Sequence, residues 1–188
     1  VSVGIADYPG TGMDLSLCAN DAKTVTWLYT KNTNVMYCQL LNSDATRSKI
    51  ISALKQLFAK ADSGDIVVFF YSGHGYEGGF HVYDGELSYQ AIQSAMAGSR
   101  CNNKMIFADA CFAGQLRSGN SSSSTNTIRK ANVMLFLSSR NDEVSYEYGG
   151  MKNGLFTTYL IKGLRGNADY NKDRIISAKE LFKFVHTG

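Results

Sequence analysis

Short apolar runs and longer amphipathic stretches alternate along the chain. The runs Val1–Ala6 and Val35–Leu41 predict strands. Three further runs, Ile66–Tyr71, Met105–Ala108 and Val133–Leu137, lack polar alternation, which indicates strands buried on both faces of a parallel sheet. Strands that alternate with helices are typical of an α/β fold. We therefore expect a mostly parallel central sheet of about six strands flanked by helices.

The helices are expected between these strands. Asn20 or Asp21 can cap the first helix, because such side chains accept hydrogen bonds from the free N–H groups at a helix start. By the same argument Ser43 or Asp44 is expected to cap the second helix. Three more helices are expected near Tyr89–Met96, Leu155–Leu164 and Ala178–Val185.

One polar segment interrupts the apolar pattern. The chain has 188 residues, 44% of them hydrophobic, which is enough for one core, so a single domain over residues 1–188 is expected. Residues 115–131 include the serine run Ser121–Ser124 and are too polar to join that core. We expect a flexible linker there, with the parts on either side held together because Val133–Leu137 completes the sheet.

The charges give little reason to propose a nucleic-acid partner. Nineteen Lys and Arg against 16 Asp and Glu leave a formal net charge of +3, without a long basic run. The longest apolar run, Ile66–Tyr71, is far shorter than the ~20 residues that span a bilayer, so no membrane span is expected. Because an expected strand begins directly at Val1, an upstream extension that carries a targeting signal is an open alternative. The cellular compartment therefore stays open.

Two residues with chemical potential follow buried strands. In an open α/β sheet, ligands bind outside the carboxyl ends of the strands. His74 follows Ile66–Tyr71, and Cys111 follows Met105–Ala108. A cysteine nucleophile needs a nearby base and an amide-rich pocket for the oxyanion. The residues fit this chemistry, and they equally fit a buried cysteine and a hydrogen-bonded turn histidine, so the pattern alone leaves both interpretations open.

Two motifs favour the catalytic interpretation. Phe69–Gly75 (FFYSGHG) and Asp109–Gly114 (DACFAG) together resemble the catalytic motifs of caspase-like peptidases of family C14, in the metacaspase and bacterial caspase-homologue branch. Leu17–Ala22 resembles the segment after that family's first strand, and Gly154–Leu181 resembles its closing helices. The resemblance implies a caspase-like three-layer sandwich and a cysteine endopeptidase that requires no cofactor.

The resemblance also assigns roles to residues. Cys111 would attack the scissile carbonyl, His74 would act as acid and base, and the backbone N–H groups of Gly75 and Cys111 would form the oxyanion hole. The caspase signature has Gln where this chain has Asp109. A carboxylate at the base of the pocket selects a cation, so protein or peptide substrates with Arg or Lys before the scissile bond are expected.

Four positions of this sequence resemble those that form the first specificity pocket in metacaspases. They are Cys18, Asp21, Ser72 and Asp109. Asp21 has a competing explanation as a helix cap, and Cys18 and Ser72 compete with core and turn roles. Basic residues flank the serine-rich linker, so an enzyme with this preference could cut itself there, although a merely solvated loop is equally consistent. The possible sites of self-cleavage are Arg117, Arg129 and Lys130.

A calcium site is a further possibility. Asp169, Asn171, Asp173 and Glu180 place oxygen atoms at EF-hand loop positions 1, 3, 5 and 12, with Ser177 at position 9. Against it, Arg174 occupies the sixth position, where Gly normally makes the sharp turn, so an ordinary acidic turn with a helix cap remains the alternative. Calcium activation in metacaspases uses another acidic cluster, and the matching region here offers only Glu77, Asp84 and Glu86.

Two alternatives to this function stay open. One is a clostripain-like or gingipain-like cysteine peptidase, which shares the His-Gly and Ala-Cys elements and the basic preference. The other is a catalytically latent caspase-like scaffold for protein interaction. Both His74 and Cys111 are present, which argues against the scaffold.

Overall fold

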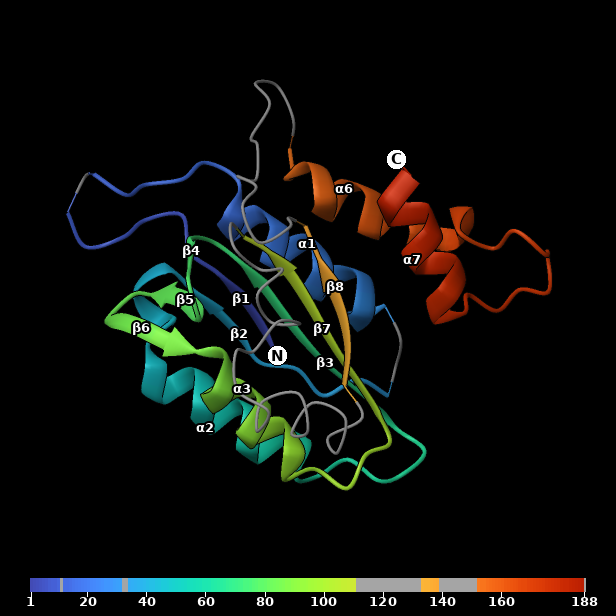
Figure 1. The fold of residues 1–188 in the computed structure, drawn as a ribbon, viewed down its shortest axis with the longest axis horizontal. Coiled ribbons are helices and arrows are strands. Elements are labelled where there is room, and N and C mark those ends of the chain that lie inside the picture. The colour runs from blue at the N-terminus through green and yellow to red at the C-terminus, as the bar shows by residue number, and fades with distance from the viewer. Residues whose placement is uncertain (11, 32–33, 111–132, 139–151, 188) are drawn as a thin grey trace.

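A parallel sheet forms the centre of the computed structural model, which describes residues 1–10, 12–31, 34–110, 133–138 and 152–187 (Figure 1). The described part of this sheet has five strands in the order β2-β1-β3-β7-β8, and every neighbouring pair is parallel. Their bounds are β1 Ser2–Gly4, β2 Gln39–Leu41, β3 Ile66–Ser72, β7 Asn103–Asp109 and β8 Val133–Leu137. The expected α/β fold with a mostly parallel sheet is confirmed.

The central strands are buried on both faces. Phe69 and Phe70 are fully buried and belong to two different core clusters, one on each face of the sheet. Successive strand residues point to opposite faces, so a strand covered on both sides needs apolar residues at every position. Each buried Phe side chain contributes about 1.5–3 kcal/mol to folding. This burial is the reason that β3 shows no polar alternation.

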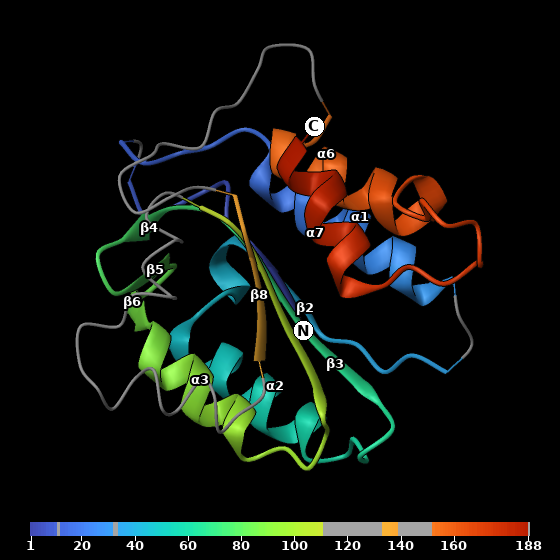
Figure 2. The ribbon, with the colours of Figure 1, turned by 45° about the vertical axis from the view of Figure 1, so that its right-hand side comes forward.

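Helices cover both faces of the sheet and complete a three-layer arrangement, as Figures 1 and 2 show. One face carries α2 and α3, and the other carries α1, α6 and α7. The helix bounds are α1 Cys18–Thr30, α2 Arg47–Phe58, α3 Tyr89–Ala97, α6 Leu155–Lys162 and α7 Ala178–Thr187. A π-helical segment, Gly163–Asn167, continues α6 and breaks at Gly166, where φ is 115°.

Both predicted helix caps are wrong. The helix α1 begins at Cys18, so Asn20 and Asp21 lie inside its first turn. Ser43 and Asp44 belong to a short 3-10 turn, Asn42–Asp44, that precedes α2.

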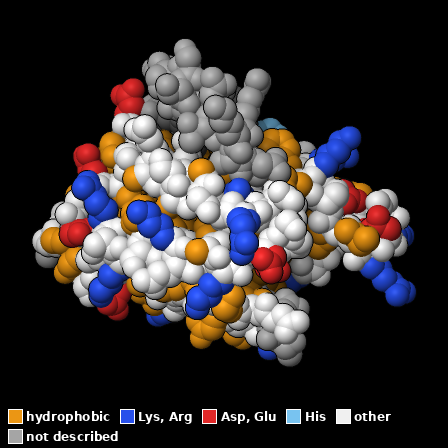
Figure 3. Space-filling view, turned by 90° about the horizontal axis from the view of Figure 1, so that it is seen from below, with side chains coloured by type: hydrophobic (Ala, Val, Ile, Leu, Met, Phe, Trp, Pro, Cys, Tyr) orange, Lys and Arg blue, Asp and Glu red, His pale blue; other side chains and the backbone are white. Residues whose placement is uncertain are grey.

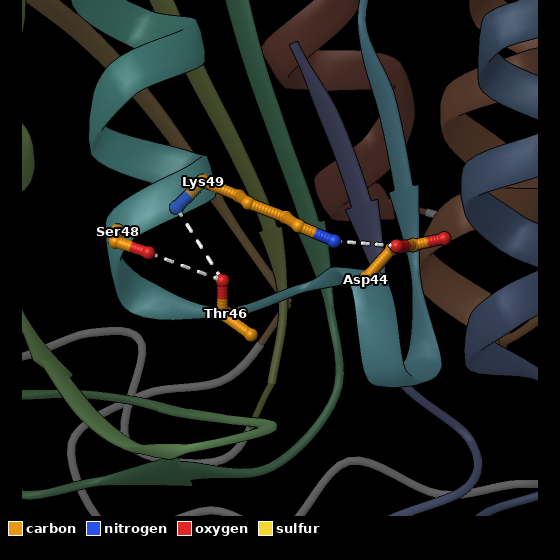
Figure 4. A network of polar contacts seen from close by, with 4 residues as sticks. All are labelled: Asp44, Thr46, Ser48 and Lys49. Atoms are coloured by element: carbon orange, nitrogen blue, oxygen red, sulfur yellow. Dashed lines mark hydrogen bonds and ion pairs between the residues drawn. The ribbon is translucent and has the colours of Figure 1, made fainter.

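The residue that caps α2 is Thr46. Its hydroxyl accepts a hydrogen bond from the Lys49 backbone N–H group at 3.4 Å (Figure 4). Asp44 instead forms an ion pair with the Lys49 ammonium at 2.6 Å. Both partners of this pair are exposed, so it contributes at most about 1 kcal/mol.

A small antiparallel sheet follows β3 directly. Its strands are β4 (Gly75–Tyr76), β5 (Gly79–Val82) and β6 (Gly85–Ser88), and β5 lies in the middle. The sheet leads into α3, and the Tyr89 N–H group donates to the Gly78 carbonyl oxygen. The small sheet thus begins at Gly75, directly after His74 and close to the carboxyl end of β3.

The face drawn in Figure 3 shows no block of one charge. On the face seen in Figure 3, Lys and Arg side chains are spread out and acidic side chains lie between them. Within the described ranges, no helix has both the length and the apolar composition that a bilayer crossing requires.

Candidate active site

The carboxyl ends of β3 and β7 bring the two sequence motifs together. Ser72 and Asp109 pair in register at the last positions of these strands. The Gly73 N–H group then donates to the Asp109 carbonyl oxygen at 3.2 Å. The turn that carries His74 therefore leaves the sheet beside the strand that leads to Cys111.

Two buried tyrosines hold this turn in place. The Tyr8 hydroxyl accepts a hydrogen bond from the His74 backbone N–H group at 2.9 Å. The Tyr71 hydroxyl lies 2.9 Å from the His74 carbonyl oxygen and 2.6 Å from the His81 carbonyl oxygen, and the two acceptors share its single hydrogen. A Cβ atom on Gly73 would lie 2.6 Å from the Tyr71 hydroxyl, so the turn passes too close to the ring for any other residue.

Both tyrosines keep their protons over the physiological range. Burial raises the pKa of Tyr8 to about 12 and raises the pKa of Tyr71 well above its ordinary value. The hydroxyl groups therefore remain hydrogen-bond donors, and the backbone of the His74 turn stays fixed.

The His74 ring is oriented by a backbone carbonyl. Its Nε2 atom lies 2.8 Å from the carbonyl oxygen of Met13. A carbonyl oxygen only accepts hydrogen bonds, so Nε2 carries the hydrogen and the neutral ring keeps Nδ1 as its basic nitrogen. The ring also packs against Tyr8, with 5.1 Å between the ring centroids. A catalytic base held by a third group in this way is typical of nucleophile-base pairs.

The nucleophile predicted from the sequence, Cys111, lies outside the described residues. The chain is described as far as Ala110, whose N–H group donates to the Ser138 hydroxyl at 3.0 Å. The Ser138 N–H group donates to the Ala108 carbonyl oxygen at 2.9 Å. The chain is thus anchored up to the residue before Cys111. The possible self-cleavage sites Arg117, Arg129 and Lys130 also lie outside the described residues.

Gly75, the other predicted oxyanion donor, is described. It is the first residue of β4 and pairs with Phe80 of β5. It follows His74 directly at the carboxyl end of β3, so the structure places it beside the candidate base.

Two buried carboxylates converge next to this turn. Asp21 is 1% exposed, and its Oδ2 atom accepts a hydrogen bond from the Ser72 hydroxyl at 2.9 Å. Its Oδ1 atom accepts from the Asn153 side-chain amide at 2.8 Å and from the Gly154 N–H group at 3.0 Å. Asp21 is thus hydrogen-bonded to Ser72, and Ser72 is paired with Asp109 on the neighbouring strand.

Asp109 contacts the first turn of α6. Its Oδ2 atom accepts hydrogen bonds from the Thr157 hydroxyl at 2.9 Å and from the Thr157 N–H group at 3.3 Å. The partial positive charge at a helix N-terminus favours a carboxylate at this position.

Gly154 separates the two carboxylates. A Cβ atom there would lie 2.6 Å from Asp109 Oδ2 and 3.2 Å from Asp21 Oδ2. The absence of a side chain lets the chain pass between the acids, and both of them hold the start of α6.

The proximity of the carboxylates changes their electrostatics. Burial, and then repulsion from Asp109, raises the pKa of Asp21 to about 7. The hydrogen bonds from Asn153, Ser72 and Gly154 oppose this rise. Two carboxylates in one site do not readily ionise together, and a cation near both would favour the ionised form of each.

The remaining predicted pocket residue, Cys18, is the first residue of α1 and is buried. It precedes Asp21 by one helical turn, so the two lie on the same face of α1.

Three of the proposed calcium ligands lie elsewhere, in the turn between the π-helical segment and α7, and the fourth, Glu180, lies in the first turn of α7. Asp169, Asn171 and Asp173 are close in the turn before α7, and Asn171 donates to Asp173 at 2.9 Å. Glu180 instead accepts hydrogen bonds from Ser177. No group of three or more His, Cys, Asp or Glu side chains is assembled for a metal ion within the part of the chain that the structure describes.

A cavity of about 690 Å³ lies at the opposite end of the sheet. It is lined mainly by apolar side chains near the amino ends of β1, β3 and β7, such as Val1, Ile66 and Met105. The titratable groups of the two motifs lie at the carboxyl ends, so we place the chemistry there and not in this apolar cavity.

Several site residues were not predicted from the sequence. The Met13 carbonyl has no sequence signal, because every residue carries one. Tyr8 and Asn153 reach the site only through long-range packing. Thr157 had a usable signal, since it lies in the first turn of a predicted helix, where side-chain and backbone donors face outward.

Comparisons with known proteins bear on the family and the fold. The sequence profile of the caspase domain, Peptidase_C14, matches residues 1–187. A crystal structure of a protein from Geobacter sulfurreducens has a similar fold, with a TM-score of 0.71 and 19% sequence identity over 98% of this chain and 86% of that one. Curated protein sequences give no match. With a caspase-domain profile over nearly its whole length and the corresponding fold, the chain belongs to the caspase-domain family of cysteine peptidases.

Proposed function

We propose that this protein is an endopeptidase that hydrolyses peptide bonds after Arg or Lys. The observation that carries the proposal is the convergence of Asp21, Ser72 and Asp109 beside the His74 turn. Buried acids at the carboxyl end of a parallel sheet lie where such folds bind ligands, and a buried negative charge favours a cationic partner.

The hydrogen-bond partners of Asp21 support this preference. Ser72, Asn153 and Gly154 are all neutral donors, so its charge is solvated without being neutralised. A substrate guanidinium or ammonium group supplies the missing positive charge and strengthens the hydrogen bonds to the carboxylates. A substrate Asp would meet at least one like charge in this pocket and be rejected.

The chemistry would follow the family pattern. His74 Nδ1 accepts the proton of the Cys111 thiol, and the thiolate attacks the scissile carbonyl carbon. The N–H groups of Gly75 and Cys111 stabilise the oxyanion that forms. His74 then returns the proton to the leaving amine, and a water molecule activated by the same histidine hydrolyses the thioester.

The test is the turnover of fluorogenic peptides that end in Arg, Lys or Asp, with and without calcium. We expect cleavage after Arg and Lys, and complete loss in Cys111→Ala. The variant Asp109→Asn should lower kcat/KM for Arg peptides about a hundredfold, because it removes one partner of a buried charge pair. Asp62→Asn, at an exposed site, is the matched control.

The outcomes separate the parts of the proposal. The absence of Arg and Lys cleavage under every condition contradicts it and favours a latent scaffold. A preference for Asp rejects the acidic pocket but leaves the Cys111 and His74 pair intact.

We also propose that the enzyme processes itself within the linker 115–131. Arg117, Arg129 and Lys130 match the preference of the proposed pocket. Incubation of the active protein should yield new termini after these residues, and the Cys111→Ala variant should stay intact. An active preparation that remains uncut contradicts self-processing.

A further inference from the structure

The turn that precedes α7, together with the first turn of that helix, carries a series of oxygen-bearing side chains. Counted from Asp169, they occupy the first, third, fifth, ninth and twelfth positions, which is the ligand spacing of an EF-hand loop. The residues are Asp169, Asn171, Asp173, Ser177 and Glu180.

The backbone follows the curve that such a loop needs. The Arg174 N–H group donates to Asp169 Oδ2 at 3.0 Å, and the Ile175 N–H group donates to Asp173 Oδ1 at 2.7 Å. Arg174 itself has φ of 69°, in the left-handed region that favours glycine. The sixth position thus takes the sharp turn that an EF-hand requires, although a non-glycine residue occupies it.

An independent observation points to a ligand. Asp169 Oδ1 is the one buried side-chain oxygen or nitrogen, among the residues the structure describes, that has no hydrogen-bond partner. A buried carboxylate oxygen without a partner is costly, and such atoms call for an unseen ion or water. The other oxygen of this carboxylate accepts a hydrogen bond from the Arg174 N–H group, so the side chain is held in place while Oδ1 has no partner.

We propose that residues 169–180 form a single, weak calcium-binding loop. This inference does not depend on the peptidase function. Oxygen side chains and a backbone carbonyl at the seventh position, here Ile175, are the ligands that calcium prefers over softer metals.

Two features set the affinity low. Glu180 accepts hydrogen bonds from the Ser177 hydroxyl and N–H group at 2.7 Å and 2.9 Å, and it must leave them to reach the ion. Three basic residues balance the three carboxylates of the loop, namely Lys172, Arg174 and Lys179. We expect a dissociation constant on the order of 10⁻⁴–10⁻³ M, the range of weak extracellular calcium modules.

The experiment is a calorimetric titration of calcium into the full chain, in a Cys111→Ala background that prevents self-cleavage. We expect one saturable site, an increase in Tm on calcium addition, and at least about tenfold weaker binding of magnesium. Asp173→Asn should weaken calcium binding about tenfold or more, because the loop loses a charged ligand. The exposed Asp62→Asn variant should bind as the parent does.

A second variant, expected to bind calcium more tightly, keeps the test decisive if Asp173→Asn does not fold. Arg174→Gly removes both the left-handed strain and a positive charge, so calcium should bind about tenfold more tightly. Absence of saturable binding up to about 10 mM calcium in both the parent and Arg174→Gly overturns the proposal. Binding that Asp173→Asn leaves unchanged in a folded protein overturns it too.

Discussion

At the residue scale, Asp21 lies between neighbours that act on its charge in opposite directions. Burial and Asp109 oppose ionisation, whereas the donors Ser72, Asn153 and Gly154 favour it. The balance raises its pKa from the ordinary 3.8 to about 7. The sequence placed Asp21 at the correct end of the sheet, but its burial and its partners come from distant segments.

This shift predicts a pH dependence of stability. Because the folded-state pKa lies above the unfolded value, the folded protein binds more protons between about pH 4 and pH 7, and the free energy of unfolding falls as pH rises through that window. Asp21→Asn should remove a slope of about 1 kcal/mol per pH unit. Urea unfolding at pH 5, 6 and 8 measures the difference. A variant whose stability runs parallel to that of the parent shows that Asp21 titrates normally.

Gly154 gives a second prediction at this scale. Gly154→Ala places a Cβ atom 2.6 Å from Asp109 Oδ2, so the start of α6 must shift. We expect a loss of about 1–3 kcal/mol in the free energy of unfolding. Gly64→Ala is the matched control, because a Cβ atom there meets no other atom within 4 Å. Equal stabilities of the two variants in urea unfolding would show that the acids do not enclose Gly154.

At the scale of elements, periodicity located the strands and helices better than it located their ends. The run Ile66–Tyr71 became β3, and Val133–Leu137 became β8 without change. The expected strand Val35–Leu41 begins only at Gln39, and Met36 and Tyr37 before it are exposed. The start of a helix depends on the φ and ψ angles of a single N-cap residue. Several neighbouring polar residues in the sequence are candidates for the N-cap, so the pattern does not select one of them.

At the start of α2, the N-cap hydrogen bond of Thr46 can be compared with the ion pair between Asp44 and Lys49. Thr46→Ala removes the side-chain acceptor at the N-cap and should cost about 1 kcal/mol of stability. Asp44→Asn breaks an exposed ion pair and should cost less than about 0.5 kcal/mol. Thermal and urea unfolding of both variants provide the comparison. A larger loss in Asp44→Asn would reverse the assignment of the cap.

At the scale of the whole molecule, the sheet joins the segments before and after residues 115–131, the linker expected from the sequence. The strand β8 pairs with β7 over five residue pairs, from Lys104 with Val133 to Ala108 with Leu137. Phe107 and Phe136 pack with 4.9 Å between their ring centroids. These contacts connect segments before and after residues 115–131 within one core cluster.

A cut in the linker should therefore leave the molecule associated. A recognition site for an unrelated protease, inserted between residues 119 and 126 of the Cys111→Ala variant, allows cleavage without self-processing. We expect both fragments to co-elute in gel filtration and to separate only in denaturant. Separation of the fragments in native buffer would mean that the β7–β8 pairing is too weak to hold them together.

The sequence by itself determined the alternation of strands and helices, the motifs around His74 and Asp109, and with them the fold and the family. These features are local, because hydrophobic periodicity and short motifs depend on residues close in the chain. Only the tertiary structure decided that Met13 orients the His74 ring and that Gly154 separates two acids. Asp21 and Gly154 bond across 133 positions of the chain, and only packing brings such residues together.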